Sequence, residues 1–172
     1  LADHYHLVVT NPPYLGLGAM SDDLAAHVRG EFDVAKRELA LCMTARISQL
    51  VRPCGTMALV LPGEWTYARA YRAFRSQFLA HHSVHTLVRL GPNAFSSGVR
   101  ANPVLIVASA GATTAGAIAT FDVMKESVEE KGQSLRSMDV AVVSQRVWRE
   151  APDNRMLGSA RDLRLGSTMA DY

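Results

Sequence analysis

Short apolar runs alternate with segments of helical periodicity along the first 110 residues of the chain. Proline and glycine bound most of these runs, which are short and continuously apolar, as is typical of strands buried in a parallel sheet. The predicted strands are residues 6–10, 56–61, 84–90 and 103–108, and the predicted helices are residues 21–29, 33–50 and 67–80. This order predicts part of a doubly wound α/β sheet, in which chemistry lies in the loops at the carboxyl ends of the strands.

The pattern changes after residue 121. Residues 124–135 form a charged, amphipathic helical segment, residues 117–121 and 140–147 are compatible with strands, and periodicity is weak beyond Trp148. We therefore predict an α/β core over residues 1–121. A helical or irregular extension over residues 122–172 is expected to lead towards a further domain.

The composition of the 172 residues is that of an ordinary globular protein, with 48% hydrophobic and 20% charged residues, and it excludes a wholly disordered chain. No apolar run reaches about 18 residues, so no membrane span is expected. Two cysteines without metal-ligand spacing fit a reducing, cytoplasmic compartment. The first residues carry neither a start methionine nor a signal peptide, so we expect the chain to come from the middle of a longer protein.

Charge is distributed unevenly along the chain. The net charge of +2 is too small to indicate a nucleic-acid partner, but no Asp or Glu occurs between Trp65 and Phe121. Arginine, whose guanidinium suits phosphate binding, recurs in this stretch. Arginines that are merely exposed to solvent would give the same sequence pattern. The histidines of this stretch have no cysteine or carboxylate beside them, so no metal site is predicted. The basic residues concerned are Arg69, Arg72, Arg75, Arg89, Arg100, His81, His82 and His85.

The strongest chemical signal directly follows the first predicted strand, and it is the tetrapeptide Asn11-Pro12-Pro13-Tyr14. The lone pair of an exocyclic amine is delocalised into its ring, so methylating it requires acceptors aimed at the N–H groups. The Asn11 side-chain oxygen and the Pro12 carbonyl can supply them, and the rings of Pro12 and Pro13 fix φ and hold them in place. Tyr14 offers a flat face on which an extruded base can stack, which implies base flipping.

The tetrapeptide and the strand before it resemble the catalytic motif of the S-adenosylmethionine-dependent amino-group DNA methyltransferases. Residues 32–50 resemble the helix that follows in that family, and residues 50–55 resemble its "L-x-P-G-G" turn, with Cys54 in place of the first glycine. The resemblance implies a Rossmann-like class I methyltransferase sheet, of which this chain holds the second half, strands 4 to 7.

Residues 65–75 and 90–95 resemble a narrower group, the adenine-specific methyltransferases of phage defence: the type IIG restriction–modification enzymes and the BREX enzymes of the PglX type. The resemblance implies transfer of a methyl group to adenine N6 in double-stranded DNA. It also implies that Phe95 supports the flipped base beside Tyr14, and other defence-system subunits are possible partners. We take Arg69, Arg72 and Arg100 as candidate DNA contacts. The extension would then lead towards a target-recognition domain.

The cofactor implied by the resemblance is S-adenosylmethionine. Such enzymes hold it with a glycine-rich loop and an acidic residue on two earlier strands, and no such strand–loop–helix precedes Asn11. Gly16 and Gly18 follow the motif and are poor candidates. We therefore expect most of the cofactor site upstream of Leu1, and an isolated chain that does not turn over.

Two alternatives remain open from the residues. The Asn-Pro-Pro-Tyr chemistry also serves enzymes that methylate a protein glutamine amide or RNA, because an amide nitrogen poses the same lone-pair problem. The acid-free, arginine-bearing stretch and the Phe95 loop favour DNA. The other alternative is a non-catalytic assembly fragment.

Overall fold

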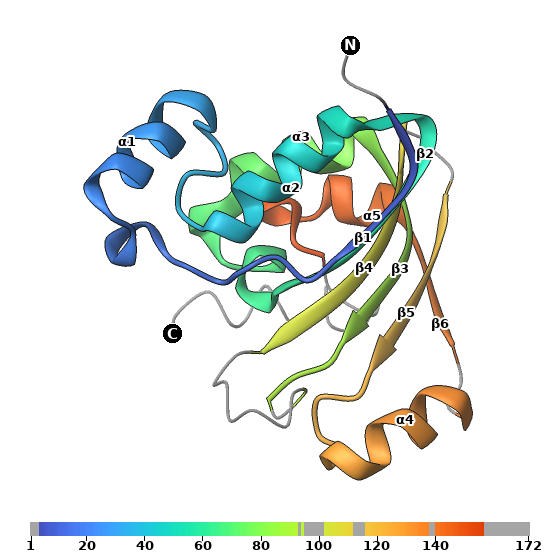
Figure 1. The fold of residues 1–172 in the computed structure, drawn as a ribbon. Helices are drawn as coiled ribbons and strands as arrows, with labels where there is room; N and C mark the ends of the chain where they lie inside the picture. Colours follow the sequence, from blue (N-terminus) through green and yellow to red (C-terminus); the bar gives the residue numbers. More distant parts are fainter. Residues whose placement is uncertain (1–3, 93, 95–101, 112–115, 138–139, 157–172) are drawn as a thin grey trace.

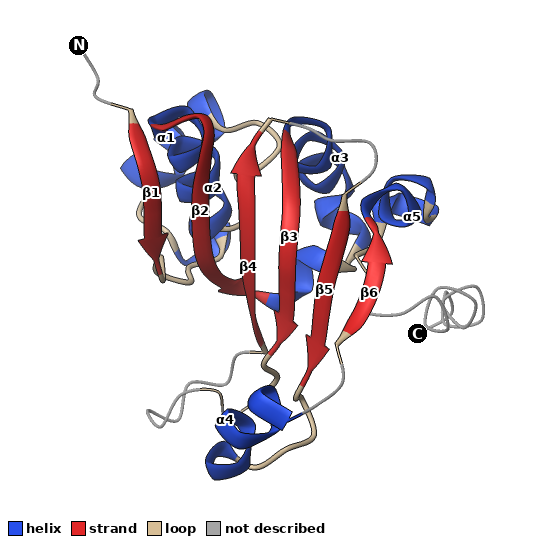
Figure 2. Ribbon diagram, turned by 90° about the vertical axis from the view of Figure 1, so that its right-hand side faces the viewer, coloured by secondary structure: helices blue, strands red, loops and turns tan. Residues whose placement is uncertain are grey.

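A mixed six-stranded sheet organises the computed structural model, which describes residues 4–92, 94, 102–111, 116–137 and 140–156. The strand order is β1-β2-β4-β3-β5-β6, and β4 and β6 run antiparallel to their neighbours. The other four strands are parallel, so their carboxyl ends lie along one edge (Figure 2). The strands are β1 (Tyr5–Thr10), β2 (Val51–Pro62), β3 (His82–Arg89), β4 (Pro103–Ala110), β5 (Ala117–Asp122) and β6 (Ala141–Ser144).

Four helices cover one face of this sheet (Figure 1): α1 (Asp22–Glu31), α2 (Leu39–Leu50), α3 (Arg72–His81) and α5 (Gln145–Glu150). The helix α4 (Val128–Ser137) lies instead beyond the carboxyl ends of β3 and β5. The short 3-10 turns are η1 (Leu17–Ala19), η2 (Gly63–Thr66), η3 (Arg69–Tyr71) and η4 (Pro152–Asn154). No helix in the described part of the chain is long and apolar enough to cross a membrane.

The core lies between the sheet and these four helices. Alternate residues of β2, such as Leu59, point into it and are fully buried. Trp65 packs edge-on against Phe74 and Phe78 of α3, each with ring centroids 5.5 Å apart. Burying each of these side chains contributes about 1.5–3 kcal/mol, so this face holds most of the stabilising contacts.

The opposite face of the sheet carries no helix among the described residues (Figure 2). At its β1 end, Tyr5, Leu7 and Val9 are 53%, 58% and 69% exposed. Leu7 and Val9 pair with Thr56 and Ala58 of β2, so these four side chains lie side by side on this face.

Two predicted boundaries differ from the structure. The helix expected over residues 33–50 begins only at Leu39, because residues 32–37 form turns and Glu38 is extended. The turn predicted at residues 51–55 is built into β2 as an irregularity, where pairing with β1 jumps from Val51 to Thr56. Cys54 has a φ of +62° there, a left-handed conformation that favours glycine.

The sheet and the core continue past residue 121, where the sequence predicted the core to end. β6 pairs with β5, and both Trp148 and Met156 are buried in the same core as the earlier helices. Residues on both sides of residue 121 therefore share one sheet, which ends with β6, and one core, which includes Met156. The further extension stays a prediction, and residues 157–172 lie outside the described residues.

Candidate functional site

The four parallel strands end at the same edge of the sheet. The candidate site is built from the segments that directly follow these strands. The NPPY tetrapeptide, residues 11–14, follows β1, and the η2 turn follows β2. Gly91 lies just after β3, and Met124 lies just after β5. Crevices at this edge are where open α/β sheets bind their ligands.

The tetrapeptide presents two free acceptors. Asn11 and Pro13 are exposed, whereas Pro12 is buried and anchors the loop beside the sheet. Within the described residues, neither the Asn11 amide oxygen nor the Pro12 carbonyl accepts a hydrogen bond. Both oxygens therefore keep their acceptor capacity, and the exposed Asn11 side chain can be reached by an amine presented at this edge.

Tyr14 is half-buried and packs against the core, whereas Pro13 before it is exposed. Burial, aided by the nearby Glu38 carboxylate, raises the pKa of Tyr14 to about 12, so the phenol is protonated at neutral pH. Its hydroxyl is buried and finds no hydrogen-bond partner within the ranges that the structure describes. Stacking of this ring on a flipped base stays a prediction.

Glu38 joins the site although the sequence did not single it out. Its Oε1 accepts a hydrogen bond of 2.6 Å from the Leu15 N–H, directly after the tetrapeptide. Burial raises the pKa of Tyr71, and the Glu38 and Glu64 carboxylates raise it further, so the two carboxylates lie on this side of the molecule. Sequence reasoning missed Glu38 because it was assigned to the interior of a helix, whereas it is the extended residue before α2.

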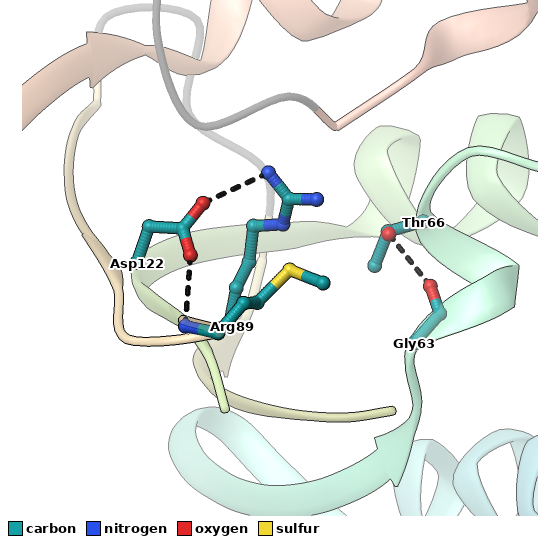
Figure 3. Close-up of polar contacts among 5 residues, drawn as sticks. Gly63, Thr66, Arg89 and Asp122 are labelled. Atoms are coloured by element: carbon teal, nitrogen blue, oxygen red, sulfur yellow. Dashed lines mark hydrogen bonds and ion pairs between the residues drawn. The ribbon is translucent and has the colours of Figure 1, made fainter. Parts of the chain in front are cut away.

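The loop after β2 and the ends of β3 and β5 form the other wall of the edge (Figure 3). The Thr66 hydroxyl donates to the Gly63 carbonyl at 2.7 Å. Arg89 pairs with Asp122 at 3.0 Å, and the other carboxylate oxygen of Asp122 accepts from the Met124 N–H. A small cavity of about 110 Å³ lies among these residues.

The three-residue arginine spacing does not produce one phosphate-binding face. Arg69 and Arg72 are exposed, as the predicted DNA contacts require, but Arg75 is fully buried. Its guanidinium donates to the main-chain carbonyls of Trp65, Ala68 and Asp153, so it ties loops together. The predicted roles of Phe95 and Arg100 lie outside the described residues.

Cofactor-binding features do not appear among the residues that the structure describes. Gly16 and Gly18 lead into the three-residue turn η1 rather than into a helix N-terminus, and α1 begins with Asp22 and Asp23, whose charges disfavour a carboxylate ligand. The described residues therefore do not fit the S-adenosylmethionine carboxylate. The same ranges hold no group of three His, Cys, Asp or Glu side chains that could bind a metal ion.

A cavity of about 430 Å³ lies away from the tetrapeptide. It is lined by α2, by α3 and by the turn between α1 and α2, and includes Phe32, Phe78, His81 and His82. His82 is buried and stacked on Phe78, and burial lowers its pKa. This cavity contains none of the predicted site residues.

Comparisons with solved structures identify the fold. A chain of a type I restriction–modification system matches 98% of this chain and 42% of its own length, with a TM-score of 0.63 at 16% identity. The type IIG restriction endonuclease BpuSI matches 96% of this chain and 22% of its own, with a TM-score of 0.62 at 15% identity. The Rossmann-like methyltransferase sheet predicted from the sequence is thereby confirmed.

Comparisons of sequence identify the family. The adenine-specific methyltransferase PglX of Lacticaseibacillus casei (strain Zhang) is 28% identical over 95 residues, and BrxX of Escherichia coli O9:H4 (strain HS) is 32% identical over 95. Each match covers 55% of this chain but only 8% of the relative. A family model described as the Eco57I restriction-modification methylase matches residues 1–95, which include the tetrapeptide and α2. The chain therefore belongs to the Eco57I restriction-modification methylase family.

Proposed function

We propose that this chain holds the target amine in a DNA methyltransferase that modifies adenine N6 in restriction–modification or BREX defence. The observation that carries the proposal is the pair of unbonded oxygens, the Asn11 amide and the Pro12 carbonyl, at the carboxyl end of β1. Family membership and relatives named adenine-specific methyltransferases support the choice of adenine.

The two oxygens act on the nucleophile. When both N–H groups of the adenine amine donate to them, the nitrogen becomes more tetrahedral and its lone pair is freed from the ring. As the new N–C bond forms and the S–C bond of the methyl donor breaks to leave a thioether, positive charge would pass to this nitrogen, which then loses one proton. Fixed acceptors would stabilise that charge without reorganising. Because the φ angles of Pro12 and Pro13 are locked, the acceptors are in place before the substrate arrives.

The methyl donor comes from elsewhere in the protein. Methylases of restriction–modification systems use S-adenosylmethionine, whose sulfonium supplies the methyl group. Since the described residues do not fit the donor, we assign its binding to parts of the longer protein outside them. The contribution of this chain is to bind and orient the amine.

Double-stranded DNA is the proposed partner. A base inside a duplex is out of reach of Asn11, so the adenine must be flipped, and Tyr14 is proposed to stack on it. The exposed Arg69 and Arg72 are proposed to contact backbone phosphates near the edge. A structural neighbour supports this partner, since the type ISP enzyme LlaGI, with a TM-score of 0.61, was solved with a DNA substrate mimic. Other defence subunits are proposed partners on the example of the type I neighbour, which comes from a system that assembles into a complex.

Methyl transfer by the longest native polypeptide that carries this chain tests the proposal. Labelled S-adenosylmethionine is offered with duplex DNA, RNA or protein, and the modified nucleoside is identified by mass spectrometry. Removing one such stabilising group typically costs about 10²–10³ in kcat, so Asn11→Ala should lose that much. Asn11→Asp keeps an acceptor oxygen and should lose less. Gln49→Ala, an exposed amide near the far end of α2, is the matched control and should be unaffected.

The outcomes separate the candidate functions. N6-methyladenine in DNA that disappears in Asn11→Ala supports the proposal. Label in a protein glutamine or in RNA moves the function to those substrates. Transfer to none of them assigns the chain a non-catalytic assembly role.

A further inference from the structure

The segment after the tetrapeptide is fastened to the start of α2. The Leu15 N–H donates to the Glu38 carboxylate at 2.6 Å, and the Leu15 carbonyl accepts from the Leu39 N–H at 2.9 Å. One residue pair further on, the Leu17 N–H donates to the Arg37 carbonyl at 2.9 Å. Residues 15–17 and 37–39 therefore form a short clamp, in which Glu38 supplies the side-chain contact.

Glu38 is itself held on a rigid element. It is the N-cap residue of α2, and its carbonyl accepts from the Leu41 and Cys42 N–H groups. Residues 40–42 are buried in the core, so the helix start cannot shift without disturbing that packing. The side chain of an N-cap residue commonly caps its own helix, but the Glu38 side chain makes no such bond and reaches the catalytic loop instead.

The clamp limits the freedom of the tetrapeptide at its far end. Thr10 is paired with Leu59 in the sheet, and Leu15 is bonded to Glu38, so residues 11–14 are tied at both ends. Two of these four residues are prolines whose φ angles are locked. The remaining rotations act together on the Asn11 side chain, the Pro12 carbonyl and the direction of Tyr14. Without the Glu38 side-chain contact, only the two main-chain bonds of the clamp hold this end of the loop, and all three groups gain freedom to move.

We propose that Glu38 is a positioning residue for methyl transfer, acting through the Leu15 N–H to hold the acceptors and Tyr14 in their productive geometry. This inference rests on the proposed function. The carboxylate also faces Tyr14 and Tyr71 closely enough to raise the pKa of each phenol, which agrees with its place beside the loop.

Three substitutions separate reach from charge. Glu38→Gln keeps the length of the side chain and an acceptor oxygen. Glu38→Asp keeps the charge but is one methylene shorter and falls away from Leu15. Glu38→Ala removes both the acceptor oxygens and the charge. Glu31→Ala, an exposed carboxylate at the end of α1, is the matched control. Each variant is made in the longest native polypeptide, and its melting temperature confirms folding.

Two readouts are compared for each variant. The first is hydrogen exchange of the Leu15 amide, which reports the clamp without any activity. The second is the kinetics of methyl transfer to DNA. Misplacing a reacting group by about 1 Å can cost 10²-fold, so kcat should fall about 100-fold in Glu38→Ala while the KM for S-adenosylmethionine stays within about twofold. Glu38→Gln should retain kcat within about tenfold, because a neutral acceptor makes a weaker bond than a charged one.

The order of the variants decides the proposal. If the length of the side chain matters, Glu38→Gln should show slower exchange of the Leu15 amide and a higher kcat than Glu38→Asp. If Glu38→Asp equals or exceeds Glu38→Gln in these two measurements, the proposal is overturned, because the charge of the side chain rather than its length then matters. Unchanged kcat in Glu38→Ala also overturns it, even if Leu15 protection is lost. A wild-type protein that methylates no substrate refutes the proposed function instead, and Leu15 exchange in the same proteins still shows whether Glu38 forms the clamp.

Discussion

Substitution of Arg75 tests most directly what stabilises the loop after β2 beside the candidate site. The Arg75 side chain is fully buried on α3, and its Nη1 donates to the Trp65 and Ala68 carbonyls at 2.6 and 2.7 Å. Its Nε and Nη2 both donate to the Asp153 carbonyl, at 3.1 and 2.8 Å. Burial lowers the pKa of Arg75 to about 10, which leaves it charged at neutral pH. One guanidinium thus joins the loop after β2, which lines the site, to the turn η4.

The cost of removing this guanidinium follows from its bonds. Arg75→Met deprives three carbonyls of a donor, and a buried acceptor left unpaired costs about 1–3 kcal/mol. The relief of an expensive buried charge offsets part of this sum. We expect a loss of about 3–5 kcal/mol, in the range for breaking buried charged contacts. For a domain of this size that corresponds to a fall in melting temperature of about 6–20 °C. Arg75→Lys should recover little, because an ammonium cannot span three acceptors.

Thermal unfolding followed by tryptophan fluorescence measures this loss, since Trp65 lies in the loop that Arg75 holds. The matched control is Arg72→Met on the exposed side of the same helix, which should change stability by less than about 0.5 kcal/mol. If Arg72 contacts a phosphate, its substitution should reduce the salt dependence of DNA binding by about one ion. A stable Arg75→Met that binds DNA weakly would refute the structural role and restore the phosphate-contact reading.

Two further predictions concern stability. Cys54→Gly should stabilise the protein by about 0.5–1 kcal/mol, because it relieves the left-handed φ of +62° at a modest entropic cost, whereas Cys54→Ala, which keeps a Cβ, should not. Urea unfolding of both variants measures the difference, and equal midpoints would contradict the argument. Burial lowers the pKa of His82, so the unfolded chain takes up a proton that the folded protein refuses, and stability should fall as the pH drops below about 6.5. His82→Gln should flatten this dependence of the urea midpoint between pH 5 and 7; an unchanged slope would assign it to other groups.

Local signals in the sequence predicted most of the elements near the site. The proline pair ends β1 and places Asn11 at its carboxyl end, because proline can neither continue the sheet ladder nor begin a helix interior. Ser21, the first residue of the helix predicted over residues 21–29, is the N-cap of α1, and its side chain accepts from the Leu24 N–H. The irregular turn at Cys54 was marked by its proline and glycine, although its inclusion within β2 was not predicted.

The predictions that were wrong or missing depend on distant partners. The second helix was expected from residue 33, because apolar spacing alone cannot detect that Glu38 is extended to reach Leu15, 23 residues away. A spacing of three residues would by itself place Arg69, Arg72 and Arg75 on one helical face. Only the packing of η4 against α3 shows that Arg75 points into the protein.

The sequence by itself determined the class of fold, the position of the NPPY tetrapeptide at a strand end and the family resemblance. These features depend on periodicity and on residues adjacent in the chain, whose effects on the backbone are local. The tertiary structure alone decided that β6, Trp148 and Met156 belong to the core, that the buried Arg75 joins two loops and that Glu38 bonds the residue after the NPPY tetrapeptide. Those facts depend on contacts between residues far apart in the chain, and such contacts exist only once the sheet has brought its strands and helices together.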